Sequence, residues 1–316
     1  MTTKEYLDGI LKNNRFILSK AITLIESSLD KDQKKSVEII ENCIDLKRKT
    51  IRIGISGTPG VGKSTFIESL GLYLVRQKYK VAILTIDPSS TISKGSILGD
   101  KTRMQKLANN DLAFIRPSPN NGKLGGVHNS TKDVITLCEA AGYDIIIIET
   151  VGVGQSEMSV QLITDLFLYL TLVENGDDLQ FIKKGALELS DMIIINKMDL
   201  NFEKAKQVKF SLENHLNMSS EKKQYIFTCS ALKNSNIKEI WNKIESLFQK
   251  NWNNNTIQLN RNKRNVIWLK KLIKEGWIKI LKQDSKFQKK ISHYHKYPPQ
   301  NTRKIALEIL GQLDLN

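Results

Sequence analysis

Short apolar runs recur through the middle of the chain, and segments with helical spacing lie between them. Uninterrupted apolar runs of about four to eight residues are typical of strands buried on both faces of a parallel sheet. Strands that alternate with helical segments such as Thr65–Gln77 predict βαβ units. We therefore expect residues 47–250 to form an α/β domain with a mostly parallel sheet and helices on both faces. The predicted strands are Ile51–Ile55, Val81–Ile86, Ile145–Ile148, Asp191–Ile195 and a short strand that ends within Phe227–Leu232.

The first 46 residues precede this domain and have helical patterns of their own. Arg15–Ser27 has apolar residues at helical spacing, and Asp30–Leu46 has a second helical pattern. We expect residues 1–46 to form a helical segment. Met1–Leu11 is charged and lacks the apolar core of a secretory signal, so no secretory signal is predicted.

Residues 251–316 follow the domain and are again helical in pattern. The asparagine-rich stretch Asn251–Arg264 predicts a linker, Pro298-Pro299 a break, and Thr302–Leu313 a last short helix. Apolar residues recur every three or four positions, and such a stripe either packs on the preceding domain or forms a contact with another protein. The stripe consists of Val266, Leu269, Ile273, Trp277 and Ile280.

The segment Gly57–Ser64, GTPGVGKS, fits the phosphate-binding loop pattern G-x-x-x-x-G-K-[ST]. It lies between a predicted strand and a predicted helix, which is the context that the pattern requires. Backbone N–H groups of such a loop and of the helix start bind phosphate oxygens, while the lysine reaches the outer phosphates and the hydroxyl ligates Mg²⁺. The predicted nucleotide contacts in this region are Gly57, Gly60, Val61, Gly62, Lys63, Ser64 and Thr65, with Lys63 also catalytic.

Asn196-Lys197-Met198-Asp199 ends the strand over Asp191–Ile195 and matches N-K-x-D, the guanine-reading signature of GTPases. A carboxylate at Asp199 accepts two hydrogen bonds, and guanine offers two donors, N1–H and the exocyclic amine. Adenine has an acceptor at N1 and would leave the carboxylate unpaired, which such sites reject strongly. Further on, the backbone of Ser230, Ala231 and Leu232 is similar to the GTPase loop that contacts the guanine carbonyl. Asn196, Lys197, Asp199 and these three residues are therefore predicted to bind GTP or GDP.

Carboxylates at strand ends indicate a magnesium site. Glu149 follows four isoleucines, stands where many GTPases have aspartate, and can hold a magnesium shell, usually through water. Asp87 ends another strand, and Asp100 lies in a loop. With the Ser64 hydroxyl they form the predicted metal site, and Glu149 is also a predicted catalytic residue.

The segment after Glu149 predicts the sensor of the γ-phosphate. The N–H of Gly152 can bond that phosphate. The next residue is Val153, where Ras-like enzymes have a glutamine that positions water. Intrinsic hydrolysis is therefore predicted to be slow or completed by another loop; Gln155 lies nearby, but nothing in the sequence aims it at the water.

Four runs make the chain resemble the MeaB family, also labelled ArgK. They are DPSSTISKGSILGDKTRM from Asp87, FIRPSPNNGKLGGV from Phe114, ETVGVGQSE from Glu149 and DDLQFIKKGALELSDMIIINKMD from Asp177. The family consists of P-loop GTPases that act as chaperones of adenosylcobalamin-dependent acyl-CoA mutases of the methylmalonyl-CoA mutase type. The resemblance covers almost the whole chain from about Phe16.

This resemblance implies a P-loop G domain flanked by N-terminal helices and a C-terminal helical dimerisation segment, hence a homodimer. It implies GTP, GDP and Mg²⁺ as ligands and a mutase as partner. It also implies a switch loop over Gly176–Lys184, whose Gln180 and Lys183 match positions linked to GTPase activation and are predicted to be catalytic. Lys94-Gly95 and Val173–Asn175 depart from the family pattern, which bears on switch kinetics more than on the choice of nucleotide.

Composition adds limits. The net charge is +15 and the pI is near 9.5, but the lysines are scattered among asparagines and isoleucines, so we expect no nucleic-acid partner. No run approaches the roughly 20 apolar residues of a membrane span, so none is expected. Three cysteines without a C-x-x-C pair suit a reducing, cytoplasmic compartment.

Two alternatives remain at this stage. A metal-insertion GTPase would predict a Cys/His cluster beside the switch loops, which the sequence lacks; His293-x-His295 alone is a weak zinc site. A transport-associated ATPase or kinase conflicts with N-K-x-D.

Overall fold

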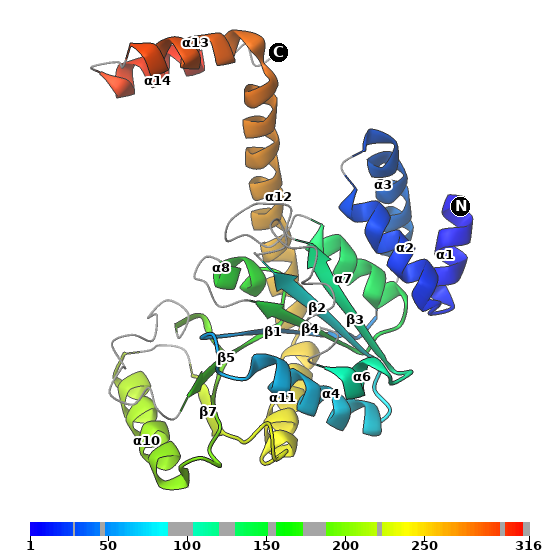
Figure 1. The fold of residues 1–316 in the computed structure, drawn as a ribbon, viewed down its shortest axis with the longest axis vertical. Coiled ribbons are helices and arrows are strands. Elements are labelled where there is room, and N and C mark those ends of the chain that lie inside the picture. The colour runs from blue at the N-terminus through cyan, green and yellow to red at the C-terminus, as the bar shows by residue number, and fades with distance from the viewer. Residues whose placement is uncertain are drawn as a thin grey trace. The chain divides into compact units, whose positions relative to one another are not determined.

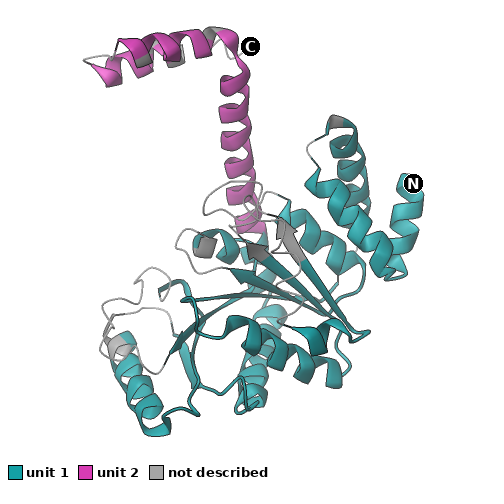
Figure 2. Ribbon diagram, in the orientation of Figure 1, with its two compact units in different colours: residues 1–261 teal, residues 262–316 magenta. Residues whose placement is uncertain are grey.

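The structure is a computed structural model that describes residues 1–27, 29–44, 48–87, 104–119, 130–150, 156–172, 188–219, 223–297 and 301–311. These residues group into two compact units, 1–261 and 262–316 (Figure 2). No described helix combines the length and the apolar character that a membrane crossing needs.

A seven-stranded sheet forms the centre of the first unit, with the strand order β3-β2-β4-β1-β5-β6-β7 (Figure 1). Every neighbouring pair of described strands is parallel, which confirms the predicted mostly parallel sheet. The central strand β1 pairs Ile53 with Ile147 on one side and with Leu166 on the other. The strands are β1 (Ile51–Gly57), β2 (Val81–Asp87), β3 (Ala113–Pro119), β4 (Ile145–Thr150), β5 (Leu166–Leu172), β6 (Met192–Asn196) and β7 (Tyr225–Thr228).

Helices cover both faces of this sheet, as the apolar runs predict. Along β6, Met192 and Ile194 belong to the core shared with α4 and α11, while Ile193 and Ile195 pack against α10 on the other face. Figure 1 shows α7 and α8 on the side of the sheet opposite α4 and α6. Strands buried on both faces have no polar alternation to preserve, which explains their isoleucine-rich sequences. The helices are α4 (Lys63–Arg76), α6 (Gln105–Ala108), α7 (Thr131–Ala140), α8 (Ser156–Gln161), α10 (Phe202–Ser219) and α11 (Ile237–Asn253).

Three N-terminal helices, α1 (Thr3–Leu11), α2 (Arg15–Glu26) and α3 (Asp30–Ile44), pack against α7 within the same compact unit. The ion pair between Arg116 and Glu26, at 2.7 Å, ties α2 to β3. The helix α1 was not predicted. It starts with a capping box between Thr2 and Glu5, a local signal that could have shown it.

The expectation of a linker over 251–264 is wrong. Helix α11 continues to Asn253, and α12 (Thr256–Gln283) begins after a turn at Asn254 and Asn255. Ile257 is buried in the main core, and this tertiary contact outweighs the weak helix propensity of asparagine. The second unit continues with α13 (Ser285–Lys296) and α14 (Thr302–Gly311). The predicted chain divisions at residues 46 and 250 stay predictions.

Candidate nucleotide-binding and catalytic site

The carboxyl ends of the parallel strands meet at one edge of the sheet, and most predicted site residues follow those ends. The loop Thr58–Gly62 leaves the central strand β1. On one side, β4 and β2 end in Glu149-Thr150 and Asp87; on the other, beyond β5, β6 ends in Asn196. The strand order therefore places Glu149 and Asp87 on one side of the phosphate loop and the predicted base-reading residues on the other.

The phosphate loop needs its glycines for steric reasons that the structure makes explicit. Gly57 lies so close to β5 that a Cβ would overlap the carbonyl oxygen of Leu170. Gly62 has φ +91°, in the left-handed region, and a Cβ there would lie 2.8 Å from the side-chain nitrogen of Asn196. Helix α4 starts at Lys63 and has no side-chain cap. Such a helix start is suited to binding an anion.

Lys63 lies over this loop. Its ammonium donates to the carbonyl oxygens of Gly57 at 2.9 Å and Thr58 at 3.2 Å. The hydroxyl of Thr58 is buried and finds no hydrogen-bond partner among the described residues. The Lys63 ammonium and the Thr58 hydroxyl, both at the N-terminus of α4, can donate hydrogen bonds to phosphate oxygens.

Ser64 and Glu149 meet on the β4 side of the loop. The Ser64 hydroxyl donates to Glu149 Oε1 at 3.2 Å, and Glu149 is only 9% exposed. Asp87 ends β2, in which Thr85 and Ile86 pair with Glu149 and Thr150 of β4. Hydroxyl and carboxylate oxygens are the ligands that Mg²⁺ prefers, so this pair fits the ion. Among the described residues, no group of three or more His, Cys, Asp and Glu side chains is arranged around a metal position.

A cavity of about 180 Å³ opens on the other side of the loop. Residues from three separate motifs surround it, and all but Leu200 were predicted to bind the nucleotide. The lining consists of Gly62, Thr65, Asn196, Lys197, Asp199, Leu200, Ala231 and Leu232.

Asn196 joins the phosphate loop to the loop after β7. Its side-chain nitrogen donates to the carbonyl of Val61 at 2.9 Å, and its Oδ1 accepts from the Ala231 N–H at 3.0 Å. The buried thiol of Cys229 donates to the same oxygen at 3.4 Å. Asn196 is only 2% exposed, so it holds the two loops together as well as lining the cavity.

Asp199 supplies the negative charge of this cavity. A hydrogen bond from Ser230 lowers the pKa of the Asp199 carboxyl, so the group is ionised at neutral pH and acts only as an acceptor. Lys197, two positions before the aspartate, adopts φ +62°, an uncommon conformation for a residue with a side chain. The turn is fixed to β7, because the Met198 N–H donates to the Cys229 carbonyl at 3.0 Å.

Several predicted residues lie outside the described part of the chain. These are Asp100, Gly152, Gln180 and Lys183, together with Val153, Gln155, Lys94-Gly95, Val173–Asn175 and the switch loop Gly176–Lys184. Their assignments stay predictions.

Sequence reasoning missed Leu200, Cys229 and Ser69, all of which lie at or behind the cavity. Leu200 and Cys229 are sequence neighbours of predicted residues, which is the only signal that could have found them. Ser69 follows Thr65 by four positions on α4, so it lies on the same face of that helix.

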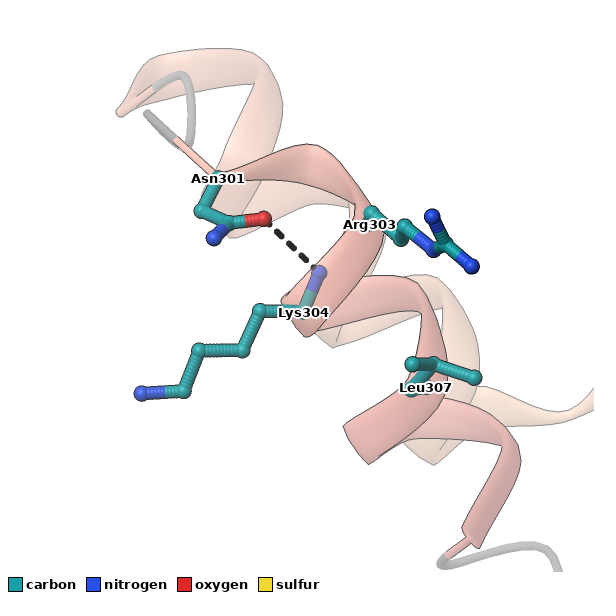
Figure 3. A pocket seen from close by; sticks show the side chains of 4 residues that line it. All are labelled: Asn301, Arg303, Lys304 and Leu307. Atoms are coloured by element: carbon teal, nitrogen blue, oxygen red, sulfur yellow. Dashed lines mark hydrogen bonds between the residues drawn. The ribbon is translucent and has the colours of Figure 1, made fainter.

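A second hollow lies against α14 in the other compact unit (Figure 3). It is lined by Asn301, Arg303, Lys304 and Leu307, and Asn301 caps the helix by accepting from the Lys304 N–H at 3.0 Å. None of these residues was predicted to belong to a site.

A parallel sheet with a phosphate loop after its central strand, and with N-K-x-D beside a base-sized cavity, defines the P-loop nucleoside-triphosphatase class. A solved structure named LAO/AO transport system kinase shares this fold with a TM-score of 0.78 and 31% identity, covering 98% of this chain and 96% of that one. The family model described as methylmalonyl Co-A mutase-associated GTPase MeaB matches residues 18–286. The chain therefore belongs to the MeaB family of GTPases, which confirms the resemblance noted from the sequence.

Two curated relatives agree with that membership. The chain is 41% identical over 279 residues to the GTPase ArgK of Escherichia coli, covering 87% of this chain and 84% of the relative. It is 36% identical over 298 residues to the mitochondrial methylmalonic aciduria type A homolog of Mus musculus, covering 90% of this chain and 72% of the relative.

Proposed function

We propose that this protein binds GTP and GDP with Mg²⁺, hydrolyses GTP, and couples hydrolysis to cofactor loading or protection of an adenosylcobalamin-dependent acyl-CoA mutase. The observation that supports the guanine nucleotide most directly is the ionised Asp199 in a cavity that Asn196 joins to the phosphate loop. The family description and the name of the mouse relative support the mutase as partner.

Separate groups of site residues are proposed to bind the phosphates, the base and Mg²⁺. The N–H groups at the start of α4 and the ammonium of Lys63 bind the phosphates, and Asp199 accepts from N1–H and the amine of guanine. Ser64 and Glu149 would hold Mg²⁺, with Asp87 and Asp100 as further proposed ligands. When bound, the ion neutralises charge that develops on the phosphates. The burial of Glu149 keeps its carboxylate close to Ser64, and so close to the metal position.

Partner-stimulated hydrolysis is part of the proposal. Val153 stands where a water-positioning glutamine is found in Ras-like enzymes, so unaided turnover is expected to be slow, near ~10⁻³ to 10⁻² per second. Gln180 and Lys183 of the switch loop are proposed to complete the site when the mutase binds.

The homodimer is proposed to form through the C-terminal helices. The predicted apolar stripe on α12 consists of Val266, Leu269, Ile273, Trp277 and Ile280, and all five side chains are exposed. A contiguous apolar stripe of this length is typical of a surface that another chain covers.

Three measurements test the function. Calorimetry should show GDP binding in the micromolar range or tighter and ADP at least about a hundredfold weaker, the order expected when a hydrogen-bonding site is left unpaired. Equal affinities would exclude the guanine assignment and favour a kinase or transport ATPase.

Affinity capture from the native cell with mass spectrometry should recover the mutase, and single-turnover hydrolysis should accelerate when the mutase is added. Lys183→Ala and Gln180→Ala should each remove most of that acceleration while GDP affinity stays unchanged.

A further inference from the structure

Helix α4 makes a buried contact with the loop after β7 that no sequence motif contains. The hydroxyl of Ser69 donates to the carbonyl oxygen of Ala231 at 2.5 Å, across 162 positions of the chain. Ser69 is 8% exposed and lies one turn beyond Thr65, which lines the cavity. Ala231 is thus held from two sides, because its N–H donates to Asn196 and its carbonyl accepts from Ser69 and, more weakly at 3.4 Å, from the Asn234 N–H.

The planarity of the peptide bond gives this contact a consequence for the cavity. The described chain has no cis peptide bonds, so the carbonyl of Ala231 and the N–H of Leu232 point in opposite directions. Ser69 fixes the carbonyl toward α4, and the Leu232 N–H is therefore directed away from that helix. Leu232 lines the cavity, and its N–H makes no hydrogen bond within the described part of the chain.

The Leu232 N–H, which lies beside the cavity and has no partner among the described residues, can distinguish guanine from adenine by the group at position 6 of the base. The 6-oxo group of guanine accepts a hydrogen bond, whereas the 6-amino group of adenine is a donor and would meet the N–H unfavourably. The Ala231 N–H is already used by Asn196 Oδ1. Leu232 is thus the backbone donor with free capacity in this loop.

We propose that Ser69 is a positioning residue for nucleotide specificity: it orients the peptide between Ala231 and Leu232 so that the Leu232 N–H reads the 6-oxo group of the base. This inference rests on the proposed guanine-nucleotide function and names a determinant of it. Ser69 does not line the cavity, and its hydroxyl donates to the loop after β7, so its effect is expected on base recognition.

The test measures binding of GDP, inosine diphosphate and ADP by calorimetry, and KM and kcat for GTP, in wild type and Ser69→Ala. We expect affinity for GDP and for inosine diphosphate, both of which carry the 6-oxo group, to fall by about tenfold, the equivalent of one net hydrogen bond. ADP affinity should change little, so the preference for GDP over ADP narrows by the same factor. KM for GTP should rise by a similar factor while kcat stays constant.

Ser36→Ala is the matched control, since the Ser36 hydroxyl also donates to a backbone carbonyl, that of Gln33 at 2.7 Å, in helix α3. Ser69→Thr keeps the hydroxyl and should retain the wild-type preference, and Ser69→Cys, with a weak donor, should be intermediate. A wild-type GDP:ADP ratio in Ser69→Ala, or an equal loss for all three nucleotides, would overturn the inference while leaving the proposed function standing. A wild-type protein without preference for GDP would instead overturn the proposed function.

Discussion

At the amino-terminal edge of the sheet, two ion pairs of four charged side chains are joined by a 3.7 Å contact between Arg261 and Glu139. Arg52 pairs with Glu139 through two hydrogen bonds of 2.7 and 2.8 Å, and Arg261 of α12 pairs with Asp165 through two of 2.8 and 2.6 Å. Arg261 also donates to the Thr50 carbonyl at 2.7 Å. At the carboxyl edge, neutral amide, hydroxyl and thiol groups surround a cavity instead, with Asp199 and Lys197 on its lining.

The two edges differ in their polar groups because only the carboxyl edge is proposed to bind a ligand. The Asp165 side chain is only 1% exposed, and its charge is balanced by Arg261 and by a hydrogen bond from the Arg52 N–H at 3.0 Å. Groups that satisfy one another in this way have no capacity left for a ligand. The carboxyl edge uses backbone and neutral groups to hold its loops, which leaves the Asp199 carboxylate and the Leu232 N–H for the nucleotide. Stability and recognition are thus assigned to opposite edges of one sheet.

The largest effect is expected from Arg261→Met, which leaves the Asp165 carboxylate buried without its partner. We expect the free energy of unfolding to fall by about 3–5 kcal/mol, measured by urea denaturation, while the folded variant binds GDP with wild-type affinity. Lys206→Met, which breaks the exposed pair with Glu203, is the control and should change stability by less than about 1 kcal/mol. A similar loss in both variants would show that the amino edge has no special role.

Lys63→Ala tests the carboxyl edge, where we expect a large loss of activity and little change in stability. Removing a cation that contacts developing phosphate charge should lower GTP hydrolysis by at least about 10²–10³-fold and weaken GTP binding. Because the Lys63 ammonium donates to carbonyl oxygens of the phosphate loop, outside the apolar core, the urea midpoint should hardly move. Single-turnover hydrolysis measures the first effect, and retained activity would remove Lys63 from the catalytic site.

Asp199→Asn should change which base is bound. Asparagine offers one acceptor and one donor where the carboxylate offers only acceptors. GDP affinity should fall by about a hundredfold, while xanthosine diphosphate, whose position 2 carries an acceptor, should bind better than to wild type. Calorimetry with both nucleotides measures the exchange. Parallel losses for the two nucleotides would contradict direct base reading by Asp199.

The smallest predicted effect concerns Asp133 in the first turn of α7. Burial raises the pKa of this carboxyl from 3.8 to about 6. Since the folded state binds the proton more tightly, this group lowers stability as the pH rises through that interval, and the full cost is present above pH 6. Asp133→Asn should therefore stabilise the protein at pH 7.5, by at most about 3 kcal/mol, and have no such effect near pH 4. Thermal midpoints at both pH values measure it, with the exposed Asp111→Asn as control.

The sequence predicts the elements whose information is local. Five of the seven described strands, the phosphate loop and N-K-x-D are each contiguous and were predicted, and parallel topology then brings their ends to one edge; β3 and β5 were not predicted. Contacts between distant side chains could not be predicted: nothing near Ser69 indicates Ala231, and nothing near Arg261 indicates Asp165. The same limitation explains the wrong linker, because the asparagines of residues 251–264 become helical only through the tertiary contacts of Ile257 and Arg261.

The close approach of Gly62 to Asn196 has a consequence for redesign and for divergence of this chain. The two positions are 134 residues apart and belong to motifs usually assigned to different parts of the nucleotide, yet a Cβ at one would lie 2.8 Å from the amide of the other. A side chain at position 62 would therefore damage base recognition before any phosphate is bound. Engineers who alter the phosphate loop must treat both positions as one steric unit, and substitutions that enlarge residue 62 require a smaller partner at 196 in the same step.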